Sequence, residues 1–261
     1  SPDTLLWNGG GEMDELEWTT WVFGILGAVF VGLGKGGLPG MGNITVALYA
    51  LALPDPKMSV GVLLPVLSAS DVVAVAIYKK YGQWEHLRRL LPWAFLGVVI
   101  GYALFRSLSA DHVRILIGVF LVFFTMIHFG RLLIFKSLDD HVPDHFFFRT
   151  VLGVLGGFAT MIANAAGPIA SFYFISMRLP KYAFIGTTAW FFLIVNAVKV
   201  PFMIELGIIN LNWFPFSLAM MPFAIGATMV APKIVALINQ DLFEKLIWFF
   251  IVVAGVKLLM G

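Results

Sequence analysis

The hydrophobic pattern divides the chain into two halves that follow the same order of apolar stretches. Each half opens with two short apolar stretches around a polar or glycine-rich break, at 19–33 and 43–53 and again at 149–161 and 168–177. Three stretches of spanning length follow in each half, at 59–79, 90–106 and 112–131 and then at 183–204, 213–231 and 242–259. A helix needs about 20 apolar residues to cross a bilayer, so each short pair predicts a broken or re-entrant helical hairpin.

The composition indicates an all-α polytopic membrane protein. Apolar residues make up 60% of the chain, charged residues only 12%, and the mean hydropathy is +0.92. Charged residues are about a quarter of an ordinary soluble protein, and 261 residues could not hide so many long apolar helices from water. The absence of cysteine excludes disulfides, thiol catalysis and thiolate metal sites. The net charge of +2 is too small to indicate a nucleic-acid partner.

The two halves are also similar in sequence, which predicts an internal duplication. At a shift of about 125 positions, Gly61 aligns with Gly186 and Asp71 with Asn196. The same shift aligns further pairs, namely Leu53-Pro54 with Leu179-Pro180, Gly82 with Gly207 and Gly101 with Gly226. We therefore assign an N-terminal tail to 1–18, repeat 1 to 19–135, a cytoplasmic linker to 136–148 and repeat 2 to 149–261. Because three segments per repeat change sides, the second repeat is expected to be inverted, as in many secondary transporters.

The positions of lysine and arginine favour this topology with both termini extracytoplasmic. In it, eleven of these residues lie inside: Lys79, Lys80, Arg88, Arg89, Arg131, Lys136, Arg149, Arg178, Lys181, Lys233 and Lys245. Four lie outside: Lys57, Arg106, Arg114 and Lys257. Counting each hairpin as one broken span gives a nearly even split in the best orientation. The excess of basic residues on the cytoplasmic side therefore supports the hairpin topology in a cell membrane.

The two breaks are the expected substrate site. They read GKGGLPGMGN at 34–43 and MIANAAGP at 161–168. Irregular backbone at membrane depth is tolerated beside a cavity, and helix N-termini at Met41–Ile44 and Pro168–Ala170 would present amide groups to a small anion. The candidate substrate-binding residues are Lys35, Gly36, Gly37, Asn43, Asn164 and Gly167, with Thr187 and Asn196 on the wall of the site.

Other interpretations of the first break stay open or fail. Gly32, Gly34 and Gly37 match a dinucleotide fingerprint but lack the preceding strand and the later acidic residue, and Lys35 is followed by Gly36 where a phosphate loop needs Ser or Thr. Glycines can instead serve helix packing, as in the pairs Gly97–Gly101 and Gly153–Gly157. Lys35 could also snorkel to a membrane interface if the hairpin is shallow.

Ionisable residues inside the spans are candidates for coupling or charge balance. Asp71 lies near the middle of one span, and Lys199 follows Asn196 by one turn in another. Such groups usually mark a pathway or a buried pair. Asp71 could carry a proton, act as a counter-ion for Lys35 or Lys199, or only form a hydrogen bond between helices. The sequence HVPDH at 141–145 contains metal-ligand types, but solvated linker is the better interpretation, and no metal or other cofactor is expected.

The motifs together resemble the TauE/SafE sulfite exporter family, also called the toluene-sulfonate uptake permease family, from about Leu16 to Met260. They are GKGGLPGMG at 34–42, the segment Leu64 to Tyr78, LPWA at 91–94, ANAAGP at 163–168 and GTTAWFF at 186–192. The second break, Asn164-Ala165-Ala166-Gly167, departs from the glycine triplets of the wider family, and Val46 stands where a proline is expected. The resemblance implies a transporter of sulfite, organosulfonates or related small anions.

The expected partners follow from this interpretation. They are a small anionic substrate and the lipid bilayer, with the proton as a candidate coupling ion and a homodimer as a candidate assembly. A channel built on paired half-helices is the nearest alternative function. An enzyme is less favoured, because His128 near a span end has no obvious serine partner.

The topology can be tested with single cysteines, since the chain has none of its own. A cysteine in place of Gln83 should resist an impermeant thiol reagent added to intact cells and react after permeabilisation, because loop 79–89 is expected on the cytoplasmic side. Labelling at this position from outside intact cells would rule out the proposed orientation.

Overall fold

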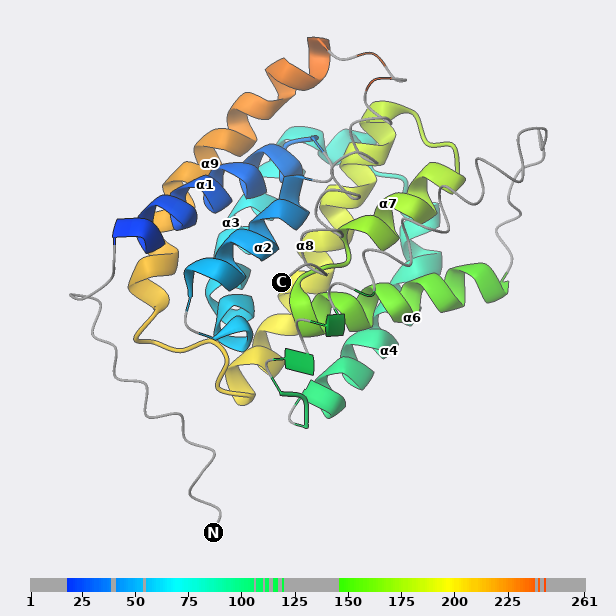
Figure 1. Ribbon diagram of the computed structural model, residues 1–261. Coiled ribbons are helices and arrows are strands. Elements are labelled where there is room, and N and C mark those ends of the chain that lie inside the picture. Colours follow the sequence, from blue (N-terminus) through cyan, green and yellow to red (C-terminus); the bar gives the residue numbers. More distant parts are fainter. Residues whose placement is uncertain are drawn as a thin grey trace.

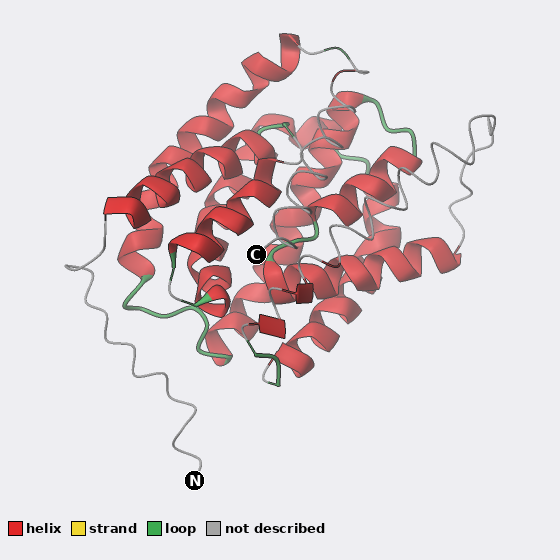
Figure 2. Cartoon of the chain, viewed as in Figure 1, coloured by secondary structure: helices red, strands yellow, loops and turns green. Residues whose placement is uncertain are grey.

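The computed structural model describes residues 18–38, 41–53, 55–105 and 146–237, together with 107–109, 111–112, 115–116, 119, 239 and 242. Within them the chain is helical and has no strand (Figure 2). The helices are α1 (Trp18–Lys35), α2 (Met41–Ala52), α3 (Pro56–Tyr78), α4 (Trp84–Phe105), α6 (Phe146–Ala163), α7 (Gly167–Ser176), α8 (Lys181–Glu205) and α9 (Phe214–Leu237), with a short 3₁₀ helix η3 (Lys79–Tyr81). The expected all-α membrane fold is confirmed.

Six of these helices are long and apolar enough to cross a membrane: α1, α3, α4, α6, α8 and α9, with the third span taken as Lys57–Tyr81. Two of them, α1 and α6, were expected as shorter pieces at 19–33 and 149–161. Each is 18 residues long, because the helix continues into the residues that flank the apolar stretch. The tail up to residue 17, the linker up to residue 145 with its HVPDH segment, and most of the expected spans 112–131 and 242–259 lie outside the described residues.

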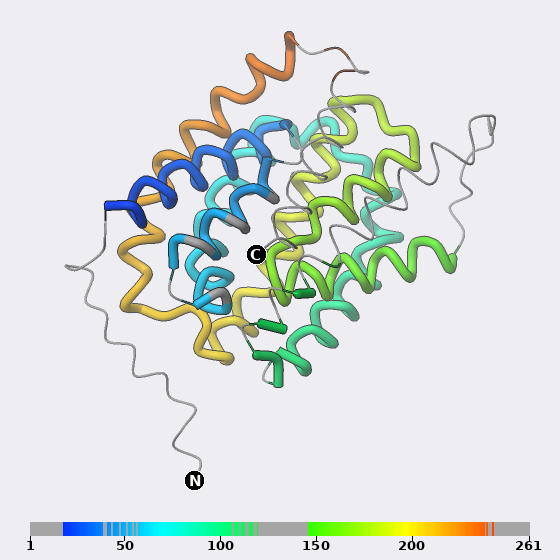
Figure 3. Tube along the Cα trace, in the orientation of Figure 1, coloured from blue at the N-terminus to red at the C-terminus, as the bar shows by residue number. Residues whose placement is uncertain are grey.

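The helices before and after each break, α1 with α2 and α6 with α7, form an antiparallel hairpin (Figure 3). In the first hairpin, Thr45 Oγ1 of α2 donates to Gly27 O of α1 at 3.0 Å, and Thr20 Oγ1 donates to Ala52 O at 3.2 Å. In the second hairpin, the Phe148 ring of α6 lies 5.9 Å from the Phe172 ring of α7. Residues early in the first helix of a hairpin thus lie beside residues late in the second, so both breaks lie at the hairpin tips.

Both breaks contain a residue with positive φ shortly after the end of a helix. Gly37 has φ 122° and Asn164 has φ 54°, so each helix ends in a residue with positive φ. Leu38 N then bonds Leu33 O at 2.9 Å, and Ala165 N bonds Ala159 O at 3.3 Å. The first bond reaches back five residues, as is typical of helix C-termini that end in glycine, whereas the second reaches back six.

The two central helices, α3 and α8, cross in opposite directions. Gly61 near the start of α3 contacts Ile208 just after α8, where an added Cβ would lie 2.0 Å from the Ile208 carbonyl oxygen. Gly186 near the start of α8 contacts Tyr78 at the end of α3 and Tyr81 of η3. Around this pair, α1 packs on α9 and α6 packs on α4, as Figure 1 shows. The first helix of each half therefore packs on a helix of the other half.

Small residues allow these close helix contacts. A Cβ added at Gly97 would lie 2.1 Å from Val154 O, and one added at Gly157 would lie 1.8 Å from Ala94 O, so the glycines of α4 and α6 interdigitate. The packing interpretation of these two glycine pairs is confirmed. On the other side of the protein, Gly32 of α1 contacts Ala224 O of α9 in the same way.

This packing predicts that Gly157→Ala lowers the thermal unfolding temperature of the purified protein. The new methyl group meets backbone atoms of α4 that cannot move aside, and overpacking costs about 1–3 kcal/mol. The matched control is Gly226→Ala on α9, where an added Cβ meets nothing within 4 Å. The control should keep or raise the unfolding temperature, and equal temperatures for both variants would contradict the close α4–α6 contact.

Candidate functional site

A connected chain of polar side chains crosses the centre of the protein. Lys35 Nζ, at the end of α1, lies 2.7 Å from Asp71 Oδ1 of α3. Asn196 Nδ2 of α8 donates to the other carboxylate oxygen, Asp71 Oδ2, at 2.7 Å. Lys199 Nζ, one turn further along α8, donates to Asn196 Oδ1 at 3.4 Å and to Asn164 Oδ1 in the second break at 2.6 Å. The first break is thereby linked to the second through the middle of α3 and α8.

The second break is held in place by Asn164. Its side-chain amide donates to Val60 O of α3 at 2.9 Å, which leaves its oxygen to face Lys199. Thr160 Oγ1, one turn earlier on α6, accepts a further bond from Lys199 Nζ at 3.1 Å. Lys199 is fully buried, and Asp71 is fully buried as well. Buried charges need such partners, because an unpaired charge in an apolar interior is strongly destabilising.

Lys35 faces both this polar chain and a cavity. Its ammonium lies 3.8 Å from the centroid of the Phe192 ring, a cation–π contact, while its other side contacts Asp71. The side chain is only 12% exposed, and its ammonium is directed at Asp71 inside the protein. This geometry argues against the snorkelling interpretation.

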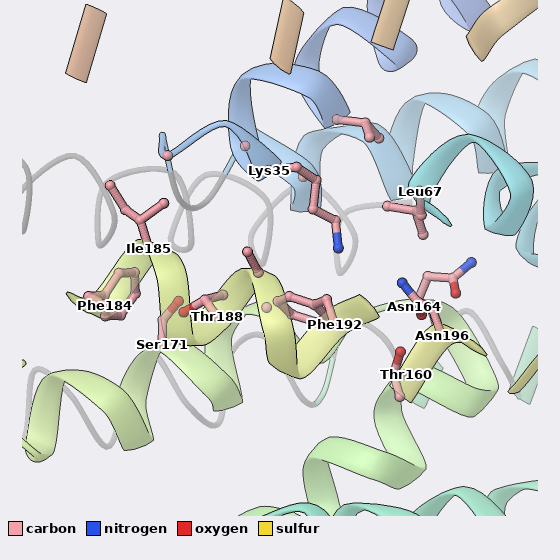
Figure 4. A pocket seen from close by; sticks show the side chains of 16 residues that line it. Lys35, Leu67, Thr160, Asn164, Ser171, Phe184, Ile185, Thr188, Phe192 and Asn196 are labelled. Carbon is pink, nitrogen blue, oxygen red and sulfur yellow. The ribbon is translucent and has the colours of Figure 1, made fainter. Parts of the chain in front are cut away.

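The cavity lies between the two breaks and along one face of α8. About 750 Å³ of space there is not filled by protein atoms, including the part that opens outward. Figure 4 shows Asn164, Asn196 and Thr160 gathered at one end with Lys35 beside them. The other end is lined by Phe184, Ile185 and Ser171 (Figure 4). The cavity therefore has a polar, cationic end and a largely apolar end.

Most of the candidate residues reach this cavity. Those that line it are Lys35, Gly37, Asn164, Gly167 and Asn196. Asp71 and Lys199 do not line it but contact residues that do. The backbone of Asn43 lies in the first turn of α2, next to the lining residue Gly42, and its side chain lies outside the described residues.

Two candidates do not reach the cavity. Gly36 packs against Ala231 of α9, and its carbonyl accepts a bond from Tyr78 OH at 2.8 Å. Thr187 Oγ1 accepts a bond from Gln83 N at 2.9 Å and donates to Ala183 O at 2.6 Å, which fixes the loop after η3 to α8. These residues stabilise the framework around the site.

The neighbouring threonine is the one that faces the cavity. Thr188 lines it, and its Oγ1 is buried without a hydrogen-bond partner among the described residues. Thr188, Phe192 and Asn196 are spaced by four residues, so they share one face of α8, whereas Thr187 is turned by about 100°. The same spacing from Asn196 could have identified Thr188 in the sequence. Gly34, Gly42 and Thr160 are further lining residues that the sequence analysis did not assign to the site.

The side chains at the site are cationic and hydrogen-bonding. In the part of the chain that the structure describes, no group of three or more histidine, aspartate or glutamate residues lies close enough to hold a metal ion. The polar end of the cavity offers an ammonium, two amides and the hydroxyl group of Thr160, while Thr188 lies toward the other end beside Ser171 (Figure 4). Such groups suit an anion with several oxygen atoms.

Comparison with known families identifies one match that covers most of the chain. The model of the sulfite exporter TauE/SafE family matches residues 24–258. Comparison with curated proteins and with solved structures gave no match.

The position of Asn164 predicts different effects for two substitutions. Asn164→Ala removes both side-chain bonds and keeps a Cβ at positive φ, whereas Asn164→Gly removes the bonds but relieves the backbone. Leaving buried groups unpaired costs about 1–3 kcal/mol, and a Cβ in the left-handed region adds about 1–2 kcal/mol. Thermal unfolding should rank native above Gly and Gly above Ala, and equal stability of Asn164→Ala and native protein would refute the role of Asn164 as the link between α3, α8 and the break.

Proposed function

The chain belongs to the sulfite exporter TauE/SafE family, and on that premise we propose that it carries a small anion through the cavity between its two helix breaks. Family membership makes it a multi-pass membrane transporter of sulfite or other sulfur compounds rather than an enzyme. The finer proposal is a secondary transporter whose substrate, sulfite, an organosulfonate or a related oxyanion or carboxylate, binds near the middle of the membrane.

One observation is the main support for this proposal. Lys35 of the first break and Asn164 of the second lie at the same end of one cavity, joined through Asp71, Asn196 and Lys199. An ammonium beside neutral amide and hydroxyl donors favours an anion, and the low polarity around it strengthens each contact. The N-termini of α2 and α7 add their positive dipole ends, since Gly42 and Gly167 in their first turns line the cavity.

The architecture that brings the two breaks together is proposed to be an inverted repeat. Three contacts support it, because they show that α3 and α8 run in opposite directions. Along α3 and η3 the contacts lie at Gly61, Asp71 and Tyr81, and their partners on and after α8 are Ile208, Asn196 and Gly186. Asp71 and Asn196 also align in the two halves. Equivalent residues that touch each other must lie close to the axis that relates the halves, so the site would lie on that axis.

The pairing also favours a charge-balancing role for Asp71. Its carboxylate contacts Lys35 directly and reaches Lys199 only through Asn196. We therefore propose that Asp71 is the counter-ion of Lys35 and holds it at the cavity wall. The proton remains our proposed coupling ion. If Asp71 carries it, the pair of Asp71 and Lys35 must separate during the transport cycle.

The proposal predicts that Lys35→Gln weakens anion binding and transport while the protein still folds. Glutamine can still donate a hydrogen bond to Asp71, whereas alanine would leave the carboxylate unpaired. A charge-assisted contact is worth about 1.5–3 kcal/mol, so affinity for sulfite should fall by about one to two decades.

Binding is measured by sulfite-dependent thermal stabilisation, and transport by counterflow in proteoliposomes that are preloaded with unlabelled sulfite or methanesulfonate. Counterflow distinguishes a carrier from a channel, since a channel does not accelerate uptake when substrate is present on the far side. The control is Lys80→Gln, which removes the same charge from an exposed position after α3. Unchanged sulfite affinity in Lys35→Gln would place the substrate elsewhere.

A further inference from the structure

We propose that the site selects its substrate by charge and accepts monovalent anions in preference to divalent anions of the same shape. This inference rests on the proposed anion site and adds to it the valence of the ligand. It follows from the number of fixed charges that the polar chain holds around the cavity.

Among the described residues, the connected polar side chains around the cavity include two cations and one anion. Lys35 and Lys199 are the cations and Asp71 is the anion. Asp71 and Lys199 are the charged residues among the fully buried side chains of the described part, and Lys35 is nearly buried. The formal charge of the empty site is therefore +1.

The hydrogen-bond directions support a charged Lys199. Asp71 can only accept, so Asn196 must donate to it and turns its oxygen toward Lys199. Val60 O can only accept, so Asn164 must donate to it and also turns its oxygen toward Lys199. With Thr160 Oγ1, the Lys199 nitrogen faces three oxygen atoms, which matches the three N–H donors of an ammonium group.

The surroundings of the other two groups also match their charged forms. Asp71 forms an ion pair with Lys35 through Oδ1 and accepts a hydrogen bond from Asn196 on Oδ2. Lys35 has a carboxylate on one side and the face of the Phe192 ring on the other, and both attract a cation.

A site of charge +1 is neutralised by one monovalent anion. A divalent anion would leave an excess negative charge in a poorly polar cavity. The cost of taking an ion from water rises with the square of its charge, whereas its attraction to a site of fixed charge rises only in proportion. At intermediate dielectric, one uncompensated charge at about 6 Å changes affinity by about ten- to a hundredfold. Shape alone cannot make this distinction between ions of equal size.

Methanesulfonate and sulfate form a matched pair for the test, since both are tetrahedral about sulfur and carry charges of −1 and −2 at neutral pH. Their dissociation constants are measured with purified protein by thermal stabilisation at constant ionic strength. The native protein should bind methanesulfonate at least about tenfold more tightly than sulfate. Equal affinities, or tighter binding of sulfate, would overturn the inference while leaving the proposed anion site intact. Stabilisation by neither ion would instead overturn the proposed site.

Variants that change the site charge in steps extend the test. Asp71→Asn raises the charge to +2 and should shift the preference toward sulfate by about tenfold or more. Adding Lys35→Gln to it returns the charge to +1 and should restore the preference for methanesulfonate. Lys80→Gln, remote from the cavity, should leave the ratio of the two affinities unchanged. If the ratio of the methanesulfonate and sulfate affinities is the same in all variants, charge selection is refuted. If a variant does not fold, the measurement on the native protein decides.

Discussion

The constraint on which the structure depends is the cost of holding charge inside a bundle of apolar helices. Lys35, Asp71 and Lys199 lie among residues that are almost entirely apolar, so each must find its partners within the protein. Lys35 contacts Asp71, Asp71 contacts Asn196, and Lys199 reaches both Asn196 and Asn164. A displacement of α3, α8 or either break by a few ångströms would break one of these contacts. The polar chain therefore fixes the relative positions of the elements that carry it.

The glycine-rich and asparagine-containing breaks have a structural role that complements this chain. Each ends its helix with a residue at positive φ, Gly37 or Asn164, and sends the backbone back along the hairpin. The turn brings a side chain of each break to the cavity, Lys35 in one case and Asn164 in the other.

Close helix packing supplies the rigidity that the polar chain needs. Gly97 and Gly157 bring α4 and α6 together, and Gly32 does the same for α1 and α9. Each hairpin is thus fixed to a long helix of the other half rather than only to its own. Glycines near a proposed substrate site consequently divide into two kinds: Gly37 and Gly167 line the cavity, while Gly36, adjacent to Gly37 in sequence, packs on Ala231.

The sequence alone determined the membrane class, most of the described helices, the two breaks and the positions of Asp71, Asn196 and Lys199 inside long helices, because apolar length, glycine and proline act locally along the chain. It also placed Lys35 and Asn164 in the correct breaks. It left three roles open for Asp71, and only the tertiary structure shows that its carboxylate lies 2.7 Å from Lys35. It assigned Thr187 rather than Thr188 to the cavity wall and Gly36 to the site, since a one-residue difference on a helix is a rotation of about 100°. Which face of a helix meets a cavity depends on neighbours far away in sequence, and only the packing of α3, α8 and the hairpins fixes it.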